Sequence, residues 1–236
     1  MAKYGIKEVA DVIFFDIETG KPVLFFDTLK VSSIENAAES ANATGGKGNA
    51  NLITWNYGRT ATLTMQDALL SMESLALLAG STVEDAVTIT KRERFTADAD
   101  GSATLADTPK GAVSIYEVND MSKEVTTGSV TGAEITGLTA DKRYAAFYEY
   151  TAPVGSKTVR FSTDKFPSTY RVVGSTVMRD QATGKDKEAQ FYIPKAQLQA
   201  GFTLTMDVEN VSTFDFNLDI LRNGDDTDLY TLTVLA

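Results

Sequence analysis

Alternation of hydrophobic and polar residues predicts that this chain is built mainly of β-strands. Two apolar runs of strand length, 12–17 and 23–27, flank a turn at 18–21 that contains Gly20. Both runs are apolar at odd and even positions. Both faces of this hairpin are therefore expected to be covered, one by a helix and the other by a second sheet or a neighbouring subunit.

Further strands are predicted along the rest of the chain. Residues 52–63 alternate between large apolar and polar side chains, and residues 112–150 hold short strands at the regular spacing of a small antiparallel sandwich. The stretches 202–209 and 213–220 each have one apolar face and one polar, largely acidic face, and a final strand covers 229–235.

A single buried helix is predicted over about 65–79. Thr64 can cap it, Asp67 stands where a capping-box acid belongs, and Gly80 suits the end of the helix. Apolar residues recur between them at the three-to-four spacing of one helical face, and additional leucines widen that face. This stripe is interpreted as core packing.

Residues 32–51 differ in composition from their surroundings, being small and polar with no aromatic residue. About twenty residues without structure inside a compact domain are unusual, and such loops are usually functional or disordered. Two interpretations remain open: a mobile surface loop, or an arm that becomes ordered against a partner. On the second interpretation the subunit interface includes Ala43, Thr44, Gly45, Gly46, Lys47, Gly48 and Asn49.

Composition narrows the possible chemistry. The 236 residues include no Cys and no His and carry a formal net charge of −10. Thiolate nucleophiles, cysteine–metal sites and the commonest general base are therefore excluded, and no enzyme activity, metal or cofactor is expected. The acidic balance argues against binding nucleic acid through phosphate contacts. A partial match to a calcium loop at 96–107 is interpreted as an ordinary linker.

No segment is apolar for long enough to span a membrane, and residues 1–7 lack the apolar stretch of a secretory signal, so synthesis in the cytoplasm is expected. Seven acids fall between positions 207 and 228, opposed by Arg222 alone. If the chain forms a ring with this face inward, Asp215, Asn217 and Asp219 line a channel that repels DNA. The alternative is an ordinary solvated outer face.

The order of these elements resembles bacteriophage tail-tube proteins and related major virion proteins. The resemblance rests on the hairpin, the long small-residue segment, the strand before the helix, and the late strands at 190–194 and 214–221. It implies an antiparallel β-sandwich or barrel core, assigned to 1–107 and 154–236. Residues 108–153 depart from a minimal tube protein and are interpreted as an inserted Ig-like module. It also implies stacked hexameric rings around a DNA channel in a virion tail, contacts with other tail proteins, and no catalysis. The alternative is an Ig-like binding module, such as a capsid decoration protein or a surface adhesin.

Overall fold

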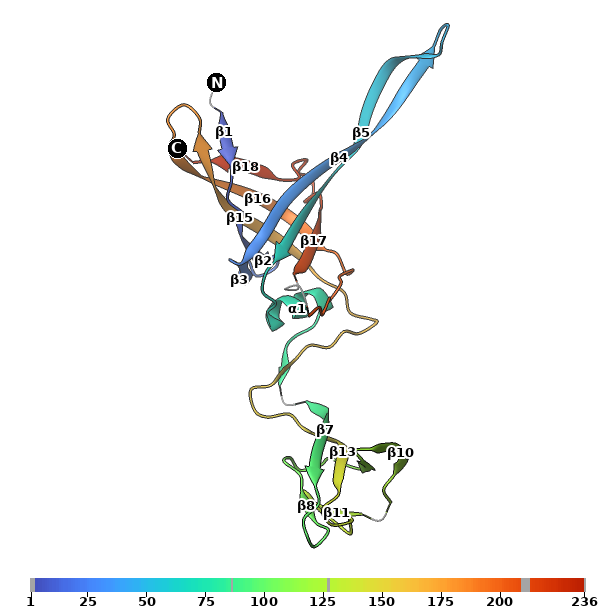
Figure 1. Cartoon of the computed structure of the whole chain (residues 1–236). Coiled ribbons are helices and arrows are strands. Elements are labelled where there is room, and N and C mark those ends of the chain that lie inside the picture. Colours follow the sequence, from blue (N-terminus) through green and yellow to red (C-terminus); the bar gives the residue numbers. More distant parts are fainter. Residues whose placement is uncertain (1–2, 86, 127, 209–212, 236) are drawn as a thin grey trace. The chain divides into compact units, whose positions relative to one another are not determined.

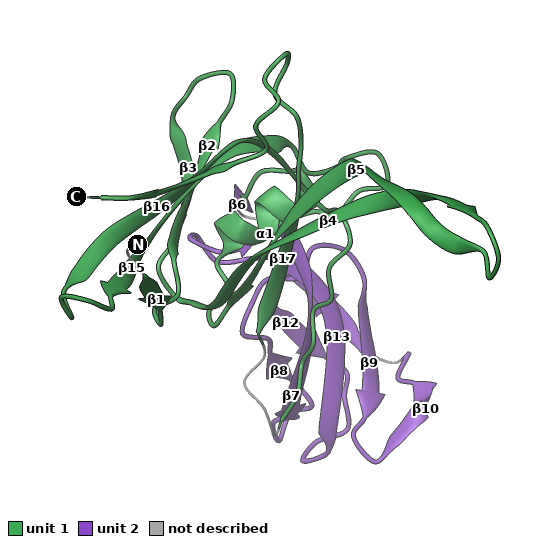
Figure 2. Ribbon diagram, turned by 90° about the horizontal axis from the view of Figure 1, so that it is seen from above, with its two compact units in different colours: residues 1–83, 159–236 green, residues 84–158 purple. Residues whose placement is uncertain are grey.

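The computed structural model describes residues 3–85, 87–126, 128–208 and 213–235. The chain divides into two compact units, residues 1–83 with 159–236 and residues 84–158 (Figure 2). The described residues form antiparallel sheets and one helix. This confirms the mainly β fold class predicted from the sequence.

The first unit is organised around an antiparallel sheet of nine strands (Figure 1). The strands follow the order β3–β2–β15–β16–β17–β5–β4, while β1 also pairs with β15 and β18 with β16. In the described part of the chain this sheet does not close into a barrel. The strands are β1 Tyr4–Ile6, β2 Asp11–Asp16, β3 Pro22–Phe26, β4 Leu29–Gly45, β5 Ala50–Asp67, β15 Thr169–Asp180, β16 Asp186–Leu198, β17 Phe214–Ile220 and β18 Thr231–Val234.

One face of this sheet carries the core of the unit. Alternate residues of β2, β5, β15, β16 and β17 point to it, so the period-2 pattern of these strands becomes one continuous apolar layer. Aromatic rings join its strands: Phe26 makes edge-to-face contacts with Phe14 at 5.3 Å and with Phe216 at 4.9 Å between ring centroids. The other face of the β2–β3 hairpin stays partly open in the described chain, with Val23 and Phe25 exposed.

The helix α1, Met72–Ala79, begins later than the sequence predicted. Residues 65–67 instead complete β5, and Asp67 is no capping acid, because its carboxylate accepts hydrogen bonds from Thr28 and from the backbone N–H of Leu69. Ser71 caps the helix: its Oγ accepts from the backbone N–H of Ser74 at 2.9 Å. The described residues include no helix with the length and apolarity of a membrane span.

Gly80 ends the helix as predicted. Its φ of 60° is left-handed, and a Cβ at this position would lie 2.1 Å from the carbonyl oxygen of Phe166. Glycine is therefore needed here for its conformation and for the close approach of a second segment.

Two long segments of the first unit differ from their predicted state. Residues 29–45 form strand β4 along most of the stretch predicted to be a loop. Conversely, residues 202–208 belong to no sheet although their alternation predicts a strand. Position 209, the end of that predicted strand, lies outside the described residues.

The second unit, residues 84–158, has its own core. Its two main sheets have the orders β10–β9–β13–β7 and β11–β12–β8, and a two-stranded ladder, β6–β14, joins its ends. The strands are β6 Glu84–Asp85, β7 Thr88–Thr96, β8 Ala103–Thr104, β9 Val113–Glu117, β10 Asp120–Glu124, β11 Ser129–Thr131, β12 Glu134–Thr136, β13 Arg143–Thr151 and β14 Lys157–Thr158.

The unit is wider than the module predicted at 108–153. Strand β7 lies before that module, yet it pairs with β13 over nine residues from Arg143 to Thr151. That a separately folding module is inserted here stays a prediction. The compact unit begins at Glu84 and ends at Thr158, and these two residues pair with each other.

Replacing Leu75 of α1 by Asp is expected to unfold the first unit. Leu75 is buried, and an isolated carboxylate there costs several kcal/mol, comparable with the whole stability of a typical domain. Leu69→Asp is the matched control, because that leucine is 64% exposed. Thermal unfolding followed by circular dichroism compares the two. A cooperative transition near the wild-type temperature in Leu75→Asp would contradict this burial.

Joining Val83 to Val159 through a short Gly-Ser bridge is expected to leave the first unit folded. The ladder between β6 and β14 brings these ends together, so the bridge closes a small gap. Removing 108–153 instead is expected to lower solubility and the cooperativity of melting, because it deletes β13 and leaves its partner β7 unpaired. Solubility and cooperative melting of both deletions measure the difference. Equal behaviour of the two would contradict these boundaries.

Candidate subunit interface

Strands β4 and β5 run far beyond the sheet and form a projecting two-stranded arm, residues 37–60 (Figure 1). Strand β17 pairs with β5 between Ala61 and Asp67, so among the described residues 50–60 pair with β4 alone. Eleven strand residues extend roughly 35 Å. Residues of the arm are exposed or half-buried throughout.

The two faces of the arm differ in chemistry. Residues that pair across the strands share a face, as do residues two positions apart. One face is mainly apolar and holds Ala41, Ala43, Ile53, Trp55 and Tyr57, with Glu39 paired opposite Tyr57. The opposite face is mainly polar: it holds Ser40, Asn42, Thr54 and Asn56 besides the exposed Leu52, and the Thr54 hydroxyl donates a hydrogen bond to Asn42 Oδ1 at 2.7 Å.

Nothing in the described chain covers the apolar face. Ile53 and Trp55 are each 54% exposed and Tyr57 is 53% exposed. A two-stranded ribbon has no core of its own, and contiguous exposed apolar residues on a surface mark sites of interaction. The arm therefore has the character of a protein-binding surface.

The residues predicted for the interface form the tip of this arm. Ala43, Thr44 and Gly45 end β4, and Gly46 to Asn49 make the turn. The turn needs left-handed backbone at Gly46, Gly48 and Asn49, with φ of 77°, 87° and 51°. Their role in an interface stays a prediction. The prediction from the sequence did not include the apolar face behind the tip. The alternation of apolar and polar residues at 53–57 indicated that face.

The predicted channel residues lie together on β17, on the face of the sheet turned away from the core. Phe216 and Leu218 point into the core, so Asp215, Asn217 and Asp219 point out. Gln66 Nε2 donates to Asp215 Oδ1 at 2.9 Å, and Gln199 Nε2 donates to Asp219 Oδ1 at 2.8 Å. These side-chain amides hold the carboxylates in place without neutralising their charge. Whether this face lines a channel stays a prediction.

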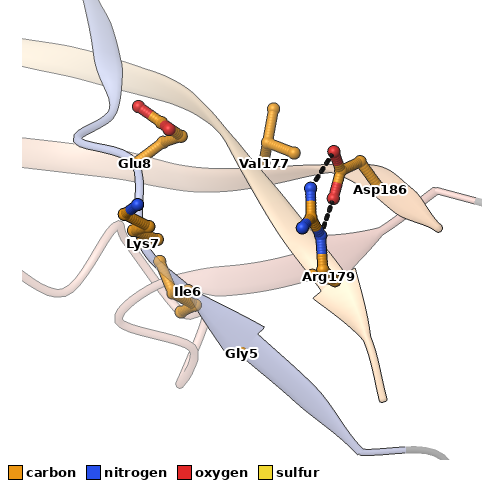
Figure 3. Close-up of a pocket in the computed structure, with 7 residues that line it drawn as sticks. All are labelled: Gly5, Ile6, Lys7, Glu8, Val177, Arg179 and Asp186. Carbon is orange, nitrogen blue, oxygen red and sulfur yellow. Dashed lines mark hydrogen bonds and ion pairs between the residues drawn. The ribbon is translucent and has the colours of Figure 1, made fainter. Parts of the chain in front are cut away.

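A depression of about 310 Å³ lies between β1 and the β15–β16 hairpin (Figure 3). Its charged groups include a cross-strand pair in which Arg179 Nε lies 2.6 Å from one Asp186 oxygen and Nη2 lies 2.8 Å from the other. The guanidinium lowers the pKa of Asp186 through these hydrogen bonds. The pair is exposed and therefore contributes little to stability. Within the described ranges, no group of three or more acids is arranged to hold a metal ion.

The chain was compared with known proteins. The model of the YomU/Tube protein family matches residues 4–232. This chain belongs to that family. Membership confirms the tube-protein resemblance drawn from the sequence and makes the chain a tube-type structural protein, a virion component. No curated protein matches it.

Changing Ile53, Trp55 and Tyr57 together to Thr is expected to leave the stability of the isolated subunit within about 1 kcal/mol of wild type. These side chains are exposed, and threonine keeps the β-propensity of the arm. The control is Leu63→Thr on the same strand, which is buried and should cost several kcal/mol. Urea unfolding measures both. A large loss in the triple variant would show that the apolar face packs within its own subunit.

Proposed function

We propose that this chain is the tail-tube subunit of a bacteriophage. On this proposal it assembles into stacked hexameric rings, contacts other tail proteins at the ends of the tube, and encloses a channel through which DNA passes without specific binding. The proposal assigns it no catalysis. The observation that carries it is the arm, which presents an uncovered apolar face well away from the core of a chain belonging to a tube family.

Physical reasoning connects the arm with assembly. A ring or tube subunit must bury apolar surface against a copy of itself, and it must protect the edges of its sheet. The arm supplies the apolar surface, because Ile53, Trp55 and Tyr57 have no cover within the described subunit. Strands β3 and β4 end the order of the sheet and supply edges that neighbours can cover.

The polar face of β17 fits a channel wall by its chemistry. The two aspartates lie beside Thr62, Thr64 and Gln66 on the neighbouring strand, which gives a wet surface of negative charge. Duplex DNA carries about one charge per 1.7 Å and is repelled by such a wall, so it can pass without binding.

We further propose that residues 84–158 form an Ig-like module. Besides its two packed sheets, this unit has a tyrosine near the start of β13, Tyr144, whose hydroxyl accepts a hydrogen bond from the backbone N–H of Thr139 at 3.1 Å. A tyrosine placed in this way is a feature of Ig-type sandwiches. A binding function of the whole chain, as a decoration protein or adhesin, is the alternative that this observation favours.

Replacing residues 38–59 by Asn-Gly is expected to leave a folded monomer that no longer forms tubes. Asn-Gly makes a tight hairpin turn, and the buried residues of β5 begin only at Ala61. Circular dichroism, sedimentation and negative-stain microscopy test fold and assembly. Variants Asn42→Thr and Asn56→Thr on the polar face serve as controls that keep assembling. If the variant without the arm still formed normal tubes, the arm would not be part of the subunit interface.

Changing Asp215 and Asp219 to Lys is expected to permit tube formation and to slow DNA ejection. The reversed charge attracts DNA to the channel wall, and salt weakens that attraction. Ejection from mutant virions should therefore be slow at low ionic strength and recover as salt is added. The control is the same reversal at Asp98 and Glu134 in the second unit. Normal ejection at every salt concentration would place the β17 face outside the channel.

A further inference from the structure

An apolar cavity of about 280 Å³ opens on the core side of the nine-stranded sheet. Its floor is formed by the buried residues Ala10, Leu63, Met178 and Phe191. Strands β1 and β18, which border its mouth, lie at the opposite end of the sheet from α1 (Figure 1). The helix therefore covers one end of the core, and this cavity is left at the other.

The mouth of the cavity is exposed and carries apolar side chains beside the polar residues Glu8 and Ser33. Ile6 on β1 is 61% exposed and Leu232 on β18 is 54% exposed. Two large aliphatic side chains at the rim of an apolar cavity form a surface that gains free energy when a partner excludes water from it.

Three of the polar side chains that line the cavity have partners within the chain, and the other two polar lining residues, Glu8 and Ser33, are exposed to solvent. Ser32 Oγ accepts from the backbone N–H of Ala10 at 3.1 Å, and the Thr176 hydroxyl donates to the carbonyl of Glu8 at 3.1 Å. The Tyr230 hydroxyl accepts from Asn36 Nδ2 at 2.8 Å. An occupant consequently needs few polar groups of its own. An apolar cavity of about 150 Å³ takes up benzene, so one of 280 Å³ has room for a two-ring side chain.

The chain contains one such side chain, Trp55, on the apolar face of the arm. Trp55 cannot reach the cavity of its own subunit. Leu63, in the floor of the cavity, lies eight residues along the same strand, which places Trp55 roughly 27 Å away. Pairing with β4 keeps this part of β5 extended.

We propose that Trp55 of one copy inserts into this cavity on a second copy. The proposal rests on the proposed function and names the site on the neighbour that accepts the arm. Ile53 and Tyr57 then pack on the rim formed by Ile6 and Leu232. Because the two surfaces differ, the contact is head-to-tail, and it repeats from copy to copy into a ring or a filament.

Site-directed cross-linking tests this contact, since the chain has no cysteine. Tyr57→Cys, which keeps Trp55, and Leu232→Cys are made in separate chains, mixed under assembly conditions and treated with a short bismaleimide. A covalent dimer is expected in the mixture. The matched control, Asn56→Cys with Leu232→Cys, places the thiol on the opposite face of the arm and should give at least tenfold less dimer. Equal yields would overturn the proposal.

Charged rim variants give a second, independent measurement. Ile6→Glu combined with Leu232→Glu should leave the melting temperature unchanged, because both residues are exposed, and raise the protein concentration needed for assembly at least tenfold. Met121→Glu in the second unit is the control. Normal assembly of the rim variant would overturn the cavity contact and leave the tube proposal standing. A wild-type chain that never assembles would overturn both.

Discussion

A two-stranded ribbon cannot bury its own side chains, and this constraint governs the organisation of the first unit. Strand β4 up to about Ile34 and strand β5 from Ala61 onward belong to a sheet with a core beneath it. Beyond those residues the same two strands continue without a layer below. Apolar side chains placed there, Trp55 above all, remain exposed until another molecule covers them. We propose that assembly covers the apolar face of this strand pair.

The rest of the first unit fixes the direction of the arm and carries two further surfaces. The arm is an extension of strands that are paired into a nine-stranded sheet, so its direction is fixed by the ladder with β17 and by the core below. The capped helix covers one end of the core and leaves an apolar cavity at the other. The face of β17 turned away from the core keeps its acids, held by glutamine side chains. One sheet thus carries three different surfaces, and we propose that the first two meet copies of the chain and that the third faces DNA.

Period-2 alternation in the sequence was enough to predict the strands that lie over the core, such as β17, and Gly80 marked the end of the helix. It could not predict the start of the helix, because Met65 fits both the three-to-four spacing of a helix and the alternation of a strand. It missed β4, whose outer half pairs with β5 over no core and so shows no hydrophobic period. It also predicted a strand at 202–209, of which 202–208 belong to no sheet, because alternation reveals an amphipathic segment but says nothing of whether a partner strand exists. The residues of the arm tip were located by composition, whereas the cavity depends on strands far apart in the chain and leaves no local signal.

The fluorescence of Trp55 tests the central claim most directly, because it is the one tryptophan of the chain and stands on the arm. Its emission and its quenching by acrylamide can be followed in purified subunits as they assemble, with microscopy of the same samples. The account predicts that emission moves to shorter wavelength and quenching falls in step with the appearance of rings or tubes. Complete assembly with Trp55 still emitting and quenching as it does in the monomer would contradict it.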